Sequence, residues 1–134
     1  MNRSRLLLNY SGNKSIGIIG SRRRDSGLDQ KILREKFFEI YKDGDIIVSG
    51  GCRKGGDRFA EKIAKDNGIP ILIFHANWNV YGKSAGMIRN GDIALNSDVI
   101  IACVSKDRTG GTENTIELYI KKCKKNNKKE ELYL

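Results

Sequence analysis

At 134 residues and 15.0 kDa, with 39% hydrophobic and 31% charged residues, the chain has the size and composition of one globular domain, which excludes a disordered protein. Its longest apolar runs have the length of buried strands and fall far short of the roughly 20 residues that a membrane helix needs. The net charge of +9 comes largely from a lysine run at 121–129, which is more typical of a solvated helix face than of a nucleic-acid patch.

The sequence also indicates where the protein is located and whether its cysteines are oxidised. In residues 1–10, arginines precede only three leucines, too few for a signal-peptide core, so we expect a cytoplasmic protein. Cysteines at 52, 103 and 123 and the single His75 fit neither a disulfide framework nor a zinc site. We therefore expect reduced thiols, no metal ion and no resident cofactor.

In chain order, short apolar runs alternate with segments of helical spacing. The first half predicts a strand at 15–19 that ends at Gly20, a helix at 28–41 capped by Asp25 or Ser26, and a strand at 45–49. A loop over 50–57 then leads into a second helix, which Asn67-Gly68 ends.

The second half continues the alternation. A strand starts near Pro70, residues 75–84 are expected to form a loop, and a third helix covers 85–96. A strand at 98–104, a loop at 105–111 and a helix from Thr112 to about Lys125 follow, and the final ELYL predicts one last short strand.

This alternation predicts the α/β class: a Rossmann-like open parallel sheet of about five strands with helices on both faces. Residues 1–134 are expected to form a single domain with a basic C-terminal helix and tail at about 118–130. In such sheets ligands bind beyond the carboxyl ends of the strands, near the switch in strand order. The loops after the first, second and fourth strands are therefore the candidate site.

The first of these loops holds Gly20, Ser21, Arg22 and Arg23. Glycine lets the backbone turn sharply and approach a ligand, and arginine supplies forked donors that suit phosphate or carboxylate. Three successive arginines, from Arg22 on, cannot all face one site, so Ser21 with Arg22 or Arg23 are the expected contacts. The alternative is a turn with exposed basic residues.

The second loop, SGGCRKGGDR, is rich in glycine and ends at a helix N-terminus, where free amides and the helix dipole favour an anion. It contains neither the Walker A spacing nor a GxGxxG fingerprint. Gly50 and Gly51 are candidate ligand contacts. Asp57 either caps its helix or recognises a hydroxyl, such as that of a ribose.

Two further elements complete the candidate site. Arg89-Asn90 lies on the third helix and either contacts a phosphate and a base or sugar, or faces solvent. Trp78, together with Tyr81, either stacks on a base or packs in the core. In the fourth loop, Gly110, Gly111 and Thr112 form an amide-rich anion cradle at a helix start, where Thr112 could also cap the helix.

The segments GSRRRD, SGGCRKGGDRFAEKIAKDNGIPILIFHANW, YGKSAGMIRN and GGTENTIE, between about Ile16 and Glu117, resemble in order and spacing the YspA-like branch of the SLOG superfamily. That superfamily also includes the Lonely Guy phosphoribohydrolases and the DprA/Smf DNA-binding proteins. The resemblance implies a Rossmann-like sheet with a pocket for a nucleotide or nucleotide derivative. It also implies a homo-oligomer, a dimer or higher.

In Lonely Guy enzymes an arginine and the glutamate of PGGxGTxxE cleave the N-glycosidic bond of a nucleoside monophosphate, and by motif position the arginine is similar to Arg89. Here PGG is missing, and Thr115 stands three residues after Thr112, where the motif has its glutamate. Glu113 and Glu117 bracket that position. If the chain is an enzyme, Arg89 with Glu117 or Glu113 are its candidate catalytic residues.

We therefore expect a binding module that senses or sequesters a phosphorylated, nucleotide-derived signal, ADP-ribose-like or cyclic, with no membrane partner. The alternative is an N-glycosidase or phosphoribohydrolase acting on nucleoside monophosphates. Nucleic-acid binding like that of DprA ranks third, because the lysine run at 121–129 has no aromatic residue within it for base stacking.

Overall fold

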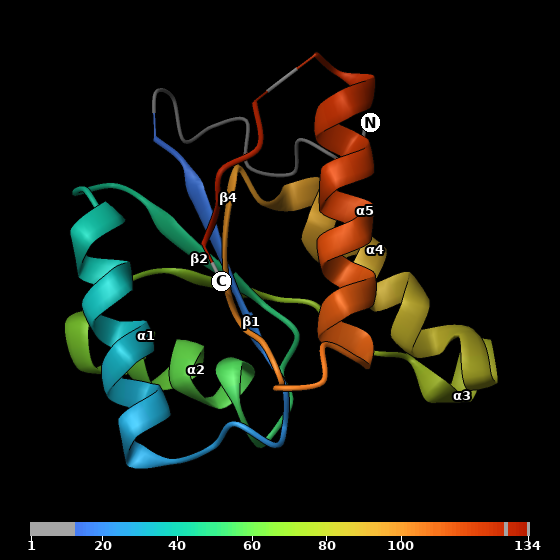
Figure 1. The fold of residues 1–134 in the computed structure, drawn as a ribbon, viewed down its shortest axis with the longest axis horizontal. Coiled ribbons are helices and arrows are strands. Elements are labelled where there is room, and N and C mark those ends of the chain that lie inside the picture. The colour runs from blue at the N-terminus through green and yellow to red at the C-terminus, as the bar shows by residue number, and fades with distance from the viewer. Residues whose placement is uncertain (1–12, 128, 134) are drawn as a thin grey trace.

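Five parallel strands form the centre of the molecule, in the order β3-β2-β1-β4-β5, which confirms the predicted Rossmann-like α/β sheet (Figure 1). The strands are β1 (Ser15–Gly20), β2 (Ile46–Ser49), β3 (Ile71–Ile73), β4 (Val99–Cys103) and β5 (Leu132–Tyr133). The chain adds β2 and β3 on one side of β1 and then returns to place β4 on the other side. The switch in strand order therefore lies between β1 and β4.

This computed structural model describes residues 13–127 and 129–133. The interpretation of residues 1–10 as too weakly apolar for a signal peptide lies outside the described residues. So do position 128 of the predicted basic tail and position 134 of the predicted last strand. No helix in the described part of the chain has both the length and the apolar character that crossing a membrane requires.

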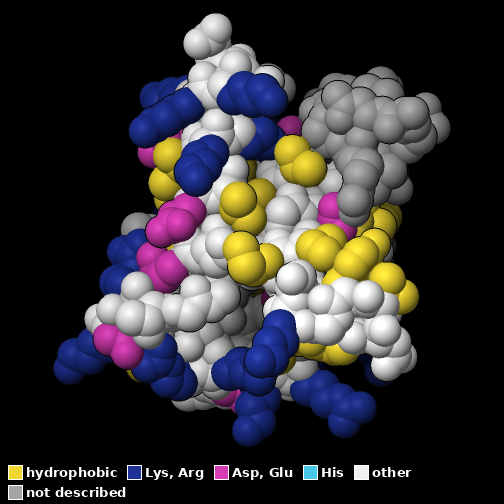
Figure 2. All heavy atoms as spheres, turned by 90° about the vertical axis from the view of Figure 1, so that its right-hand side faces the viewer, with side chains coloured by type: hydrophobic (Ala, Val, Ile, Leu, Met, Phe, Trp, Pro, Cys, Tyr) yellow, Lys and Arg dark blue, Asp and Glu magenta, His cyan; other side chains and the backbone are white. Residues whose placement is uncertain are grey.

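Helices cover both faces of the sheet, as the apolar strands predict (Figure 1). One face carries α1 (Gly27–Ile40) and α2 (Gly56–Asn67), and the other carries α4 (Ala85–Asn96) and α5 (Gly111–Lys125). On the α4 and α5 face, Figure 2 shows Lys and Arg side chains at both ends, around the C-terminal part of α5 and at the end where the strands finish.

Each face has its own apolar core. Leu33 and Phe37 of α1 and Phe59 of α2 are buried against one face of the sheet. Ile93 of α4 and Tyr119 of α5 are buried on the other. Burying one such large side chain stabilises the fold by about 1.5–3 kcal/mol, so the strands are held in place from both sides.

The start of α1 decides between the two predicted caps. Ser26 is the N-cap, and its hydroxyl accepts a hydrogen bond from Asp29 N while the Asp29 carboxylate accepts one from Ser26 N, a capping box. Asp25 instead accepts hydrogen bonds from Gly55 N at 2.7 Å and Arg58 Nε at 2.9 Å. The loop after β1 is thereby tied to the start of α2.

Two local expectations are wrong. Residues 75–84 do not form a plain loop, since they contain α3 (Trp78–Tyr81) and the 3₁₀ turn η2 (Gly82–Ser84). The Asn77 side chain accepts a hydrogen bond from Val80 N and so caps the short helix α3. Helix α5 starts at Gly111 with Gly110 as its N-cap, so Thr112 lies inside the first turn and does not cap it.

Candidate functional site

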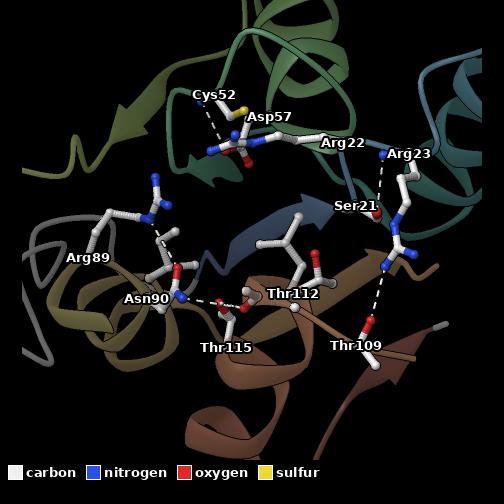
Figure 3. Close-up of a pocket in the computed structure, with 15 residues that line it drawn as sticks. Ser21, Arg22, Arg23, Cys52, Asp57, Arg89, Asn90, Thr109, Thr112 and Thr115 are labelled. Carbon is white, nitrogen blue, oxygen red and sulfur yellow. Dashed lines mark hydrogen bonds between the residues drawn. The ribbon is translucent and has the colours of Figure 1, made fainter. Parts of the chain in front are cut away.

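A cavity of about 400 Å³ opens at the carboxyl edge of the sheet, at the switch between β1 and β4 (Figure 3). Its size is within the range of ligand pockets, roughly 300–1,000 Å³. Its walls come from the loops after β1, β2 and β4 and from α4. The lining residues are Ile19, Gly20, Ser21, Arg22, Arg23, Cys52, Asp57, Arg89, Asn90, Ile93, Thr109, Gly110, Gly111, Thr112 and Thr115.

The structure thus brings most of the predicted ligand contacts to one cavity. It leaves Gly50, Gly51 and Trp78 outside its lining. Gly51 has φ +74°, and a Cβ there would lie 2.7 Å from the His75 ring, so this glycine serves close packing beside β3. Trp78 lies on α3, where 57% of its surface is exposed.

Several lining residues were missed by sequence reasoning. Ile93 could have been found, because it lies one helical turn after Arg89 and Asn90 on the same face of α4. Thr109 directly precedes the predicted glycine pair. Cys52 and Ile19 carry no signal of their own in the sequence, since one is a loop residue and the other reads as strand core.

The two candidate catalytic glutamates both lie outside the cavity lining. The Glu113 carboxylate accepts two hydrogen bonds from Arg108, from Nε at 2.8 Å and from Nη2 at 3.0 Å. Glu117 is exposed on α5. Thr115 faces the cavity instead, and its hydroxyl donates to Gly111 O at 3.1 Å.

At the first loop, the two candidate arginines have different surroundings. Arg23 forms a two-pronged ion pair with Asp107, at 2.8 and 2.9 Å, and also donates to the hydroxyls of Ser105 and Thr109. The hydroxyls of Ser105 and Thr109 also donate to Asp107 Oδ1, and together with Arg23 they hold the pKa of Asp107 well below its usual range. Arg22 makes no hydrogen bond or ion pair within the described residues, and Figure 3 shows it pointing across the cavity.

The glycines of the second loop serve chain packing. A Cβ on Gly56 would lie 2.4–2.5 Å from backbone atoms of Ile19 and Gly20, and a Cβ on Gly55 would lie 2.4 Å from Ser21 O. The N-terminus of α2 therefore rests directly on the end of β1. Since Gly55 is the N-cap and makes no side-chain cap, the prediction that Asp57 caps this helix is wrong.

Asp57 is instead a buried carboxylate in the cavity wall, with 9% of its surface exposed. Its Oδ2 accepts a hydrogen bond from Cys52 N at 3.0 Å. Burial raises the pKa of Asp57, and the backbone amides of Cys52 and Gly50 and the positive charge of Arg89 oppose that rise. The carboxylate and Arg89 meet at Gly50, where an added Cβ would lie 2.9 Å from Asp57 Oδ2 and from Arg89 Nη1.

Helix α4 links the second loop to the fourth. Arg89 Nη1 donates to Gly50 O at 2.9 Å, and Arg89 Nε donates to Asn90 Oδ1 at 3.0 Å. Asn90 Nδ2 in turn donates to Asn114 Oδ1 at 3.0 Å and to Gly111 O at 3.3 Å. These hydrogen bonds fix the positions of both loops relative to α4, so the cavity wall is organised before any ligand arrives.

The N-terminus of α5 is open toward the cavity. The first amides of a helix have no intrahelical acceptor, and no side chain caps α5. Gly110 has φ +101° with open space around its Cα, and Gly111 also lines the cavity. The acidic residue of the first turn, Glu113, is held by Arg108. The α5 end of the cavity is therefore the position where an anion would find free N–H groups.

No protein-family model and no curated protein matches the chain. Among solved structures, the molybdenum cofactor binding protein from the phototrophic bacterium Rippkaea orientalis is similar, with a TM-score of 0.65 and 24% identity over 91% of this chain and 77% of that one. This likeness shows the fold.

The cavity thus has two chemically different ends. The α5 end offers backbone amides, with Arg23 bound to Thr109 beside it, and the α2 end offers a buried carboxylate near Arg89, toward which Figure 3 shows the Arg22 side chain extending. Among the residues that the structure describes, no cluster of three or more histidine, cysteine, aspartate or glutamate side chains is arranged to hold a metal ion. The arrangement suits an anionic organic ligand that also carries hydrogen-bond donors.

Proposed function

We propose that this protein binds a phosphorylated nucleotide or a nucleotide-derived signal, ADP-ribose-like or cyclic, and senses or sequesters it. The observation that supports the proposal most is the uncapped N-terminus of α5, which opens into a cavity that Arg22 also lines. Backbone amides at a helix start and arginine side chains are the groups that proteins use most for phosphate. The location at the switch in strand order is also the usual one for nucleotides in such sheets.

We further propose that the chain belongs to the SLOG superfamily, in or near its YspA-like branch. The resemblance in motif order supports this assignment, because its motifs supply residues to all four walls of the cavity. The same resemblance supports a homo-oligomer, while chain length and the short apolar run near the N-terminus support a single-domain, cytoplasmic protein. Light scattering on the purified protein tests the oligomeric part, and a monomer at micromolar concentration would contradict it.

A binder is favoured over an N-glycosidase because Glu113 and Glu117 both lie outside the cavity lining. The hydrolase would need a carboxylate to stabilise positive charge on the ribose, and neither of these glutamates is placed for it; among the lining residues only Asp57 carries a carboxylate. Incubating the protein with nucleoside monophosphates separates the two functions: a binder returns the nucleotide unchanged, whereas free base that disappears in both Glu113→Gln and Glu117→Gln would establish the enzyme.

The molybdenum cofactor is a second candidate ligand, because a solved structure with the same fold is that of a molybdenum cofactor binding protein. It belongs in the same panel as ADP-ribose, AMP, GMP and cyclic nucleotides. Binding of the molybdenum cofactor without binding of any nucleotide would replace the first proposal with this one.

The decisive test is thermal unfolding of the purified protein with each member of that panel, followed by calorimetry. A ligand present at 100 times its Kd stabilises the folded state by about 2.7 kcal/mol, a readily measured shift. Arg22→Ala should weaken binding about tenfold or more, since a hydrogen bond to a charged group contributes about 1.5–3 kcal/mol. Arg53→Ala, an exposed arginine outside the cavity lining, is the matched control and should bind normally. No shift with any nucleotide would refute the proposal.

A further inference from the structure

The two helix N-termini at the cavity are not equivalent. The start of α5 is open, with free space at Gly110. The start of α2 is closed, because Gly56 packs on the backbone of β1 and the carboxylate of Asp57 stands in its first turn. A phosphate at the α2 end would lie against the Asp57 carboxylate, whose charge Arg89 offsets, whereas no acidic side chain of α5 lines the cavity, so the α5 end is the better anion site.

Asp57 retains free acceptor capacity toward the cavity. An ionised carboxylate offers about four acceptor positions, and the backbone amides of Cys52, at 3.0 Å from Oδ2, and of Gly50 account for two of them. Arg89 forms no hydrogen bond or ion pair with Asp57, and its Nη1 and Nε donate to Gly50 O and Asn90 Oδ1. It lies close enough, however, to favour the ionised form of Asp57.

A buried acceptor of this kind needs a donor from the ligand. Leaving a charged group buried without full hydrogen bonding is costly, and the ligand excludes the water that would otherwise serve the Asp57 carboxylate. In a nucleotide, the group bonded directly to the phosphate is the ribose, whose vicinal hydroxyls are a pair of neutral donors. With the phosphate at α5, the sugar is the part of the ligand that comes next across the cavity.

We propose that Asp57 accepts hydrogen bonds from the vicinal ribose hydroxyls of the ligand and so makes the cavity selective for ribonucleotides over 2′-deoxyribonucleotides. This inference rests on the proposed function and adds the direction of the ligand: phosphate at α5, ribose at α2. Selectivity arises because a site built to pair with a hydroxyl rejects the analogue that lacks it, which leaves the buried acceptor unpaired.

The test is calorimetric titration with the pairs AMP and 2′-deoxy-AMP, and GMP and 2′-deoxy-GMP. The wild-type protein should bind the ribonucleotide of a pair at least about tenfold more tightly, the factor that corresponds to about 1.4 kcal/mol. In Asp57→Asn the preference should fall to about threefold or less, because a neutral acceptor forms the weaker hydrogen bond. The Asn side chain keeps an oxygen for Cys52 N, so this variant should fold. Asp57→Ala should lose the preference entirely.

Asp66→Asn is the matched control, an exposed aspartate at the other end of α2 that should keep the full preference. Equal binding of both members of a pair by the wild type overturns the inference and leaves the proposed function standing. So does an unchanged preference in a folded Asp57→Asn protein. If neither member of either pair binds, the inference fails. The proposed function fails as well only if no other nucleotide of the panel binds.

Discussion

Replacing Gly56 by alanine should destabilise the protein, because α2 starts in direct contact with the end of β1. The new Cβ would lie 2.4 Å from Ile19 C and 2.5 Å from Gly20 N and from Ile19 O. Ordinary van der Waals contacts to a Cβ are about 1 Å longer, and backbone atoms on both sides leave no flexible side chain to move aside. The helix must therefore shift away from the sheet.

The size of the effect follows from the cost of overpacking, about 1–3 kcal/mol, less a gain of at most about 1 kcal/mol from replacing glycine in a helix. Gly56 is the first residue of α2, where helix propensity gains least, so we expect a net loss of about 1–3 kcal/mol in the free energy of unfolding, or roughly 4 °C in Tm for each kcal/mol lost. Urea and thermal unfolding followed by circular dichroism measure both quantities. Ligand binding should weaken as well, since the cavity wall at Gly20 moves with the helix.

Gly91 supplies the matched control. It lies inside α4 with open space around its Cα, so Gly91→Ala should stabilise the protein by about 0.5–1 kcal/mol through helix propensity alone. If Gly56→Ala were as stable as the wild type while Gly91→Ala behaved as expected, the close contact between α2 and β1 would not be a constraint on this sequence, and the packing argument would be refuted.

Three further changes test the electrostatics and the sheet edge. Burial raises the pKa of Asp57, so the folded protein binds the proton of this carboxyl group more tightly than the unfolded chain does. The contribution of Asp57 to the free energy of unfolding therefore falls as the pH rises above about 4. In Asp57→Asn, urea unfolding across pH 3–7 should lack this decrease. Asp107→Asn removes the ion pair of Arg23, so the affinity for ADP-ribose measured by calorimetry should rise and become more salt-dependent. The Tm should stay constant, because this ion pair is solvent-exposed. Tyr119→Phe removes the hydroxyl that donates to Asp98 O at 2.7 Å and accepts from Glu131 N at 3.0 Å, and should lower the free energy of unfolding by about 1 kcal/mol; an unchanged value would contradict a structural role for these bonds.

The alternation of apolar strands and amphipathic helices predicts the α/β fold because the central strands β1, β2 and β4 are buried on both faces and are almost continuously apolar. Ile46 to Ser49 and Val99 to Cys103 show this pattern, with every residue buried. The helix ends were predictable where glycine or a capping side chain marks them, as at Gly68, which ends α2 in the left-handed conformation. The short α3 was missed because one capping residue, Asn77, is a weak signal beside an irregular segment.

The candidate site was only partly predictable, because the sequence does not say which glycines are open to a ligand. Gly55 and Gly110 have the same kind of sequence context, yet one packs against Ser21 O and the other borders open space. Sequence likewise cannot show that Arg108 draws Glu113 away from the cavity, since that pairing depends on the loop conformation, in which Arg108 has φ +55°. The predicted contact by Trp78 stays a prediction.

The pairing of β1 with β4 has a kinetic consequence. Ser15 N donates to Asp98 Oδ2 across 83 residues of chain, so the two central strands join only after a long loop closes. The loops after these strands form opposite walls of the cavity, so the binding site does not exist in any intermediate that holds only β1, β2 and β3. The rate at which ligand affinity recovers during refolding would therefore report the pairing of β1 with β4. This rate can be measured separately from the earlier formation of the helices.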